Sequence, residues 1–81
     1  MDTKDIVNKP DHYTRYVIEP IEFIMHNALP FHVGNIVKYA VRAGFKSYPS
    51  MSDAEAEITD LRKVIRYAEM RINQLEGKAA L

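Results

Sequence analysis

The sequence predicts an all-α protein, a small three-helix domain whose long C-terminal helix assembles with other copies into a helical homo-oligomer. Three observations predict it. Apolar residues recur at alternating steps of four and three through the C-terminal part of the chain, which is the spacing of a helix seam. A shorter apolar stripe at helical spacing crosses the middle of the chain. Prolines and glycines fall between these stretches, where helices begin and end.

The first 17 residues show little periodicity and are expected to form an irregular N-terminal segment. Pro10 disfavours helix at the residue before it, so the stretch Asn8–Tyr13 is expected to be a turn or loop. His12 and Tyr13 in this loop either pack on the domain or contact a ligand. The helical core is expected over residues 18–77, and residues 1–81 are expected to form a single domain.

A short first helix is expected over Ile18–His26. Pro20 suits its first turn, where a backbone N–H has no partner within the helix and its loss costs little. The residues expected to be buried are Ile21, Ile24 and Met25.

The second helix is expected over Phe31–Ala43, with Gly44 just past its end, where a left-handed backbone is needed. Its buried stripe should consist of Val33, Ile36, Val37, Ala40 and Val41. The remaining arc carries an amide, a ring and three cations, and we expect it to face solvent: Asn35, Lys38, Tyr39, Arg42 and Lys46. Lysine and arginine bind phosphate, and a ring can lie against a base. An ordinary solvated helix face would show the same pattern.

The third helix is expected to begin after Ser52, which with Glu55 forms the sequence signature of a capping box, and to end near Gly77. Its seam follows heptad spacing: Ala54, Ile58, Leu61, Ile65, Ala68, Ile72 and Leu75. This apolar face is larger than two short helices readily cover, so we expect helices of different copies to pack together. The alternative is a hairpin with the second helix inside one chain.

Composition limits the classes of function. The 81 residues contain no cysteine, which excludes a disulfide and a thiolate zinc site. Eleven basic and eleven acidic side chains give a formal net charge of zero, so no specific nucleic acid partner is expected. No apolar run approaches the roughly 20 residues of a membrane span, and no secretory signal begins the chain. We expect a cytoplasmic protein with no membrane partner.

Two pairs of acidic residues are the remaining candidates for chemistry. The members of each pair are three residues apart and so share a helix face. If the pairs converge, their four carboxylates would form a Mg²⁺ site, because this ion prefers oxygen ligands and often bridges to phosphates. The metal candidates are Glu19, Glu22, Glu57 and Asp60. Glu19 and Glu22 could instead simply stabilise the positive end of the first helix.

Four successive motifs resemble those of the SaV-like family, a group of small, mostly phage-encoded proteins long catalogued as a domain of unknown function. The motifs cover most of residues 8–72: Asn8–Tyr13, Ile18–Ile24, Gly34–Lys46 and Asp60–Tyr67. The family includes a coliphage kinase that phosphorylates deoxynucleoside monophosphates, and that kinase is considerably longer than this chain. The resemblance implies nucleotide handling in the cytoplasm of an infected host cell.

The resemblance also implies roles for individual residues. It gives catalytic roles to Lys38, Arg42 and Asp60. The nucleotide-binding residues implied are His12, Tyr13, Asn35, Lys38, Tyr39, Arg42, Lys46, Lys63 and Tyr67. Lys38, Arg42 and Lys46 would contact phosphate oxygens. Asn35 would bind sugar or base, and Tyr39 or Tyr13 would stack on the base or line the pocket.

A weaker resemblance links the acidic pairs to the MazG-like all-α nucleoside triphosphate pyrophosphohydrolases, in which helix-borne carboxylates hold Mg²⁺. Here the acidic motifs lie further apart, and Ile18 stands where a second glutamate is usual. Three functions follow as expectations. The first is a nucleotide-binding protein of the nucleoside monophosphate kinase type. The alternatives are a non-catalytic protein that sequesters a nucleotide and a Mg²⁺-dependent pyrophosphohydrolase.

Overall fold

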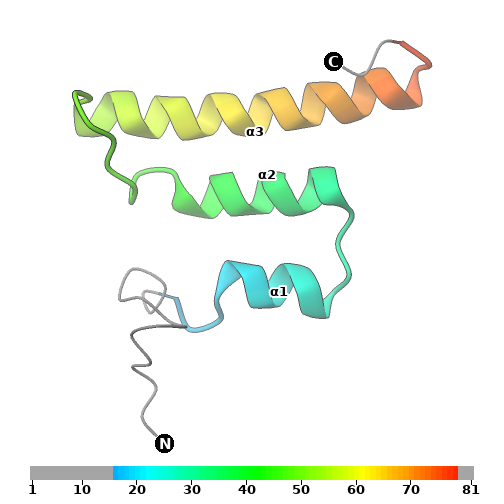
Figure 1. Ribbon diagram of the computed structural model, residues 1–81, viewed down its shortest axis with the longest axis horizontal. Helices are drawn as coiled ribbons and strands as arrows, with labels where there is room; N and C mark the ends of the chain where they lie inside the picture. Colours follow the sequence, from blue (N-terminus) through cyan, green and yellow to red (C-terminus); the bar gives the residue numbers. More distant parts are fainter. Residues whose placement is uncertain (1–15, 79–81) are drawn as a thin grey trace, which may run out of the picture.

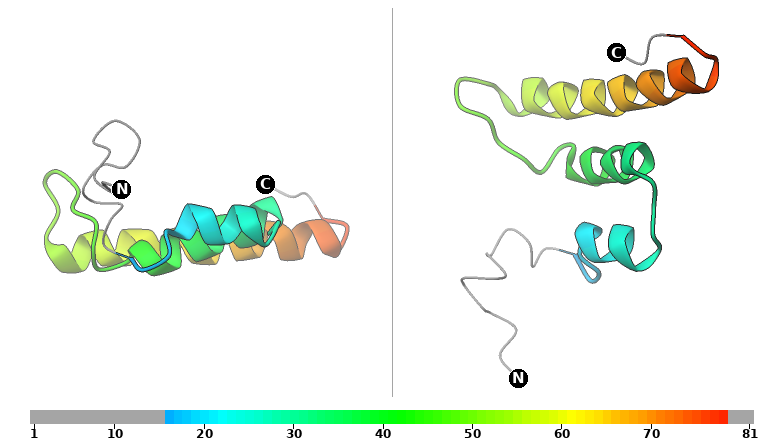
Figure 2. Two further views of the ribbon diagram at one scale, coloured as in Figure 1. Left: turned by 90° about the horizontal axis from the view of Figure 1, so that it is seen from below. Right: turned by 45° about the vertical axis from the view of Figure 1, so that its right-hand side comes forward.

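The computed structural model describes residues 16–78 and is all-α, with three helices in one layer (Figure 1). They are α1 (Pro20–His26), α2 (Phe31–Arg42) and α3 (Asp53–Leu75). α2 lies between the other two: α1 and α3 each contact α2 but not each other. The right view of Figure 2 shows the same order, and the left view shows the layer edge-on. Within residues 16–78, no helix has both the length and the apolar composition that a bilayer crossing requires.

The predicted helix ends are largely confirmed. Pro20 is the first residue of α1. The Ser52 hydroxyl accepts from the Glu55 N–H at 3.1 Å, and the Glu55 carboxylate accepts from the Ser52 N–H at 2.7 Å, so the capping box of α3 forms. Gly44 follows the last turn of α2 with a φ of +88°, a conformation that favours glycine.

α1 packs on α2 through a close backbone approach. Gly34 is buried, and a Cβ atom at this position would lie 3.0 Å from Cγ2 of Ile24. The Tyr16 hydroxyl, just before α1, donates to the Val41 carbonyl at 2.7 Å. Tyr16 and Val41 also line an apolar groove of about 210 Å³ between α1 and α2. Its other lining residues are Ile18, Pro20, Phe23 and Val37.

α3 runs antiparallel to α2 and forms the hairpin that the sequence left as an alternative (Figure 1). The hairpin does not use the predicted seam. The face turned to α2 includes Ala56 and Asp60, which are buried, and Tyr67, whose ring meets those of Phe31 and Tyr39. Seam residues remain exposed by 43–68 %: Ile58, Leu61, Ile65, Ile72 and Leu75.

The apolar core of a single chain is therefore small. Among the described residues, Ala56 is the hydrophobic side chain that the structure buries, at 2 % exposure. The predicted stripe of α2 is only partly covered, since Val33 is 40 % exposed. Predicted buried residues of α1 are also open to solvent, with Ile21 at 58 % and Met25 at 71 %. The reason is that α1 has seven residues and covers only one edge of α2.

Candidate functional site

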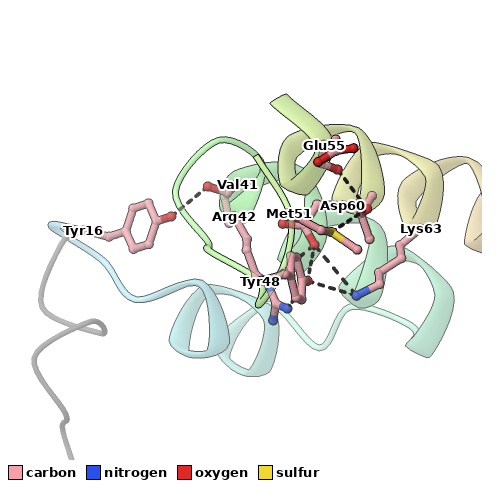
Figure 3. A network of polar contacts seen from close by, with 9 residues as sticks. Tyr16, Val41, Arg42, Tyr48, Met51, Glu55, Asp60 and Lys63 are labelled. Atoms are coloured by element: carbon pink, nitrogen blue, oxygen red, sulfur yellow. Dashed lines mark hydrogen bonds and ion pairs between the residues drawn. The ribbon is translucent and has the colours of Figure 1, made fainter. Parts of the chain in front are cut away.

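Tyr48 organises a polar network between α2 and α3 (Figure 3). It lies in the connection between these helices, next to Pro49. Its hydroxyl donates to Oδ1 of Asp60 at 2.7 Å. The hydroxyl oxygen of Tyr48 also accepts from Nζ of Lys63 at 3.0 Å and from the guanidinium of Arg42. One phenol oxygen thus joins both helices to their connection.

The carboxylate of Asp60 is the most enclosed group in this network, with 0 % exposure. Its Oδ1 lies 3.6 Å from Nε of Arg42 and 3.9 Å from Nζ of Lys63, so two cations balance its charge. Oδ2 of Asp60 and Nε of Arg42 are buried and make no hydrogen bond. A buried charge is tolerated when paired, and buried polar atoms without partners are uncommon enough to mark a position of interest.

The cations also lie over aromatic faces. Arg42, Lys63 and Lys38 lie 5.1, 4.9 and 5.2 Å from the centre of the Tyr39 ring. Arg42, Lys63 and Lys46 lie 5.6, 5.0 and 5.9 Å from the centre of the Tyr48 ring. These distances allow cation–π attraction. We call this group the tyrosine–cation cluster; it comprises Lys38, Tyr39, Arg42, Lys46, Tyr48, Asp60, Lys63 and Tyr67.

The rings of the cluster are ordered by stacking. Tyr39 and Tyr67 stack with an interplanar angle of 12° and a centroid separation of 5.9 Å. Phe31 meets Tyr67 edge-on at 6.2 Å. Aromatic pairs of this kind stabilise beyond the area they bury, by about 0.5–1.5 kcal/mol each. They hold the two helices at a fixed spacing beside the cations.

Arg42 remains a cation throughout the useful pH range. Partial burial lowers the pKa of its guanidinium, but the hydrogen bond from this group to Tyr48 and the charges of Tyr48, Asp60 and Tyr39 outweigh burial and raise the pKa above its ordinary value. The positive charge beside Asp60 is therefore permanent.

The structure brings together most of the site residues that the sequence named. Lys38, Tyr39, Arg42 and Lys46 from α2 and its extension meet Asp60, Lys63 and Tyr67 of α3. Asn35 differs, because its side-chain N–H donates to the Phe31 carbonyl of its own helix at 2.9 Å. His12 and Tyr13 lie outside the described residues.

The expectation that this arc of α2 faces solvent is wrong for Arg42. Its side chain is 28 % exposed and is directed at α3, where Asp60 and Tyr48 hold it. Lys38 and Lys46 are exposed, as expected. The physical reason is the enclosed carboxylate: Asp60 needs a cationic partner, and Arg42 provides it from the facing helix.

The four proposed metal ligands do not converge within one chain. Among residues 16–78, no three histidine, aspartate or glutamate side chains gather closely enough to hold a metal ion. Glu19 and Glu22 belong to the start of α1, which does not contact α3, and Glu22 accepts from the Glu19 N–H at 3.3 Å. Glu57 lies beside Gly44, while Asp60 is held by cations.

Sequence reasoning missed Tyr48 and Tyr16, the two tyrosines whose hydroxyls join separate elements. Tyr48 offered a signal. A tyrosine between a serine and a proline, in a connection with few large apolar residues, is expected to pack on a neighbouring element. Its hydrogen-bond partners could not be read from the sequence, because they lie 6, 12 and 15 residues away.

Comparison with known proteins places the chain in a family without giving it an activity. The model of the family described as a protein of unknown function, DUF3310, matches residues 7–69. No curated protein and no solved structure matches the chain. The matched region includes α1, α2, the connection and most of α3, and so contains the whole tyrosine–cation cluster. The chain belongs to the DUF3310 family of proteins of unknown function.

Proposed function

We propose that this chain binds a nucleotide at the tyrosine–cation cluster, as a phage protein of the nucleoside monophosphate kinase type. One observation carries the proposal. Lys38, Arg42, Lys46 and Lys63 converge on the rings of Tyr39 and Tyr48, and Asp60 is the single carboxylate of the cluster. Four cations against one carboxylate leave a local excess of positive charge in a chain whose formal net charge is zero.

The exposed cations are the ones available to a phosphate group. Lys38 lies near the Tyr39 ring and Lys46 near the Tyr48 ring, and both lysines are exposed, whereas Arg42 is held by the Asp60 network. In the proposal, Lys38 and Lys46 make the first phosphate contacts, and Lys63, with a side chain 36 % exposed, adds to the field behind them. Tyr39 and Tyr67 provide the aromatic surface for a base.

Kinase activity is the part of the proposal that depends on the resemblance to the SaV-like family and its phage kinase. Phosphoryl transfer needs positioned cations that offset charge on the transferred group, with little covalent work by the protein. Lys38 and Arg42 would serve this purpose, with Mg²⁺ entering together with the triphosphate donor. His12, Tyr13 and Asn35 remain proposed contacts to the nucleotide.

Sequestration without chemistry is the second candidate, and the state of Asp60 favours it. The carboxylate has no exposed surface and is bonded to Tyr48 with two cations beside it. In this arrangement it does not reach a substrate hydroxyl or a metal ion as a base or ligand. The cluster would then hold a phosphorylated ligand and release it unchanged.

The test measures binding first and turnover second. Isothermal titration with each deoxynucleoside mono- and triphosphate should show binding that weakens at least about tenfold in Lys38→Gln and Lys46→Gln, a change that corresponds to about one charge-assisted contact. Lys78→Gln is the matched control, because Lys78 pairs with Glu76 away from the cluster. No binding by the original chain to any of these nucleotides would reject the proposal.

Product analysis then separates the activities. Incubation with a monophosphate, a triphosphate donor and Mg²⁺ should yield a nucleoside diphosphate if the chain is a kinase. Ligand recovered unchanged indicates sequestration. Release of pyrophosphate from a triphosphate alone, abolished in Asp60→Ala, would instead indicate the hydrolase, which would require carboxylates that the single chain keeps apart.

A further inference from the structure

The face of α3 turned away from α2 is apolar along its whole length. It carries the six residues that we call the α3 seam: Ile58, Leu61, Ile65, Ala68, Ile72 and Leu75. Five of them are 43–68 % exposed, although they are large hydrophobic side chains. A continuous apolar surface of this kind marks a contact with another molecule. The small apolar core of the single chain, where Ala56 is the buried hydrophobic residue of the described part, points the same way.

The heptad positions of the seam residues indicate which kind of partner packs on the α3 seam. The three isoleucines fall at position a, and the two leucines and Ala68 fall at position d. β-branched residues at a with leucine at d favour two parallel strands over larger assemblies. The α2 contact uses Asp60, Lys63 and Tyr67, at positions c and f, which lie on the opposite side of the helix from a and d. A second helix can therefore pack on the seam without disturbing the hairpin.

The charges beside the seam fix its orientation. In a parallel pair, the g residue of one helix faces the e residue of the next heptad in its partner. This rule pairs Glu57 with Arg62 and Arg71 with Glu76, and both pairs are of opposite charge. An antiparallel pair sets e positions against each other, and three of the four e positions of α3 are glutamates: Glu55, Glu69 and Glu76.

We propose that α3 pairs with the α3 of a second copy of this chain in a parallel, in-register, two-stranded coiled coil. Arg71 and Glu76 hold partners in the single chain, Gln74 and Lys78, and both contacts join exposed side chains that can exchange them for the facing helix. The pairing puts the two tyrosine–cation clusters on the outer sides of the dimer, near the same end. It does not depend on what those clusters bind.

Sedimentation equilibrium of the full chain tests the association. The expected result is a dimer that becomes a monomer of unchanged helicity in Ile65→Asp, since Ile65 is 56 % exposed in the single chain. A monomeric original chain, or a dimer that survives this substitution, overturns the proposal.

Charge reversal and cross-linking test the orientation. Arg62→Glu should weaken the dimer about tenfold, because two Glu57 side chains then face glutamates, and Glu57→Arg combined with Arg62→Glu should restore it. The chain has no cysteine, so Leu75→Cys gives one thiol per copy, which oxidises to a covalent dimer only if the two C-terminal ends lie together. Failure of the rescue, or no disulfide in a chain that still dimerises, overturns the parallel arrangement.

Discussion

The two sides of α2 make contacts of different chemical character. The side toward α1 is small and apolar, with Gly34 against Ile24 and a shallow groove beside it. The side toward α3 is aromatic and charged, with Tyr39 stacked on Tyr67 and Arg42 paired with Asp60. The second contact is much the larger of the two. In this chain, the helix pair with more contact is the one joined by polar and aromatic groups.

This difference matters because substitutions in charged contacts and in apolar contacts change the free energy of unfolding for different reasons. Removing one partner of a buried charge pair leaves the other uncompensated, whereas changing an apolar contact alters packing by degrees. Substitutions on the α3 side should therefore unfold the hairpin more readily than those on the α1 side. Three substitutions and one matched variant test this comparison, starting with the largest expected effect.

The largest effect is expected for Asp60→Asn. The change removes the carboxylate that balances Arg42 and Lys63, and it should lower the free energy of unfolding by about 3 kcal/mol, at the low end for a buried pair because both cations are partly exposed. Urea denaturation followed by circular dichroism measures it. Glu69→Gln, at an exposed position on the same helix, is the control and should change stability by less than about 0.5 kcal/mol. Equal effects of the two would show that the network contributes nothing.

A smaller effect is expected for Tyr48→Phe, which removes only the hydroxyl that joins Asp60, Arg42 and Lys63. Hydrogen bonds to charged groups contribute about 1.5–3 kcal/mol, so a loss in that range is expected. Tyr16→Phe is the matched variant on the α1 side. It removes one bond to a neutral carbonyl, that of Val41, and should cost about 0.5–1.5 kcal/mol. The same denaturation experiment compares the two, and a reversed order would contradict the comparison.

The third substitution is Gly34→Val, which pushes α1 away from α2. A Cβ at this position already approaches Ile24, so the larger side chain should cost about 1–3 kcal/mol, reduced by whatever strain the short α1 relieves by moving. Ala40→Val places the same side chain at an exposed position of α2 and serves as the control. Limited proteolysis locates the change: cleavage should rise around α1 while α3 stays protected.

Local rules predicted the helices and their ends. The capping box of Ser52 and Glu55, the first-turn position of Pro20 and the left-handed Gly44 each depend on residues within four positions, and each formed as expected. α1 begins at Pro20, two residues later than predicted, because a proline is best placed at the first helical position.

Which face of α3 packs on α2 was harder to predict from the sequence. α3 carries two overlapping heptad patterns: the apolar seam, and a second set at Ala56, Asp60, Lys63 and Tyr67 that α2 uses. Hydrophobicity singles out the first, but the second holds the hairpin, because Tyr48 binds Oδ1 of the aspartate and two cations balance its charge. Tyr48 comes from the connection and Arg42 from the facing helix, so neither of these partners can be predicted from the periodicity of α3.

The unequal lengths of α2 and α3 have a consequence for the local opening of the backbone. Tyr67 of α3 meets Phe31, the first residue of α2, and α3 then continues for eight residues, 68–75, past the end of its neighbour. In the monomeric Ile65→Asp variant, amide hydrogens in those last turns have little tertiary structure above them and should exchange with solvent deuterium much faster than those around Asp60. A gradient of exchange along one unbroken helix would make α3 a rigid base that ends in a locally opening tip.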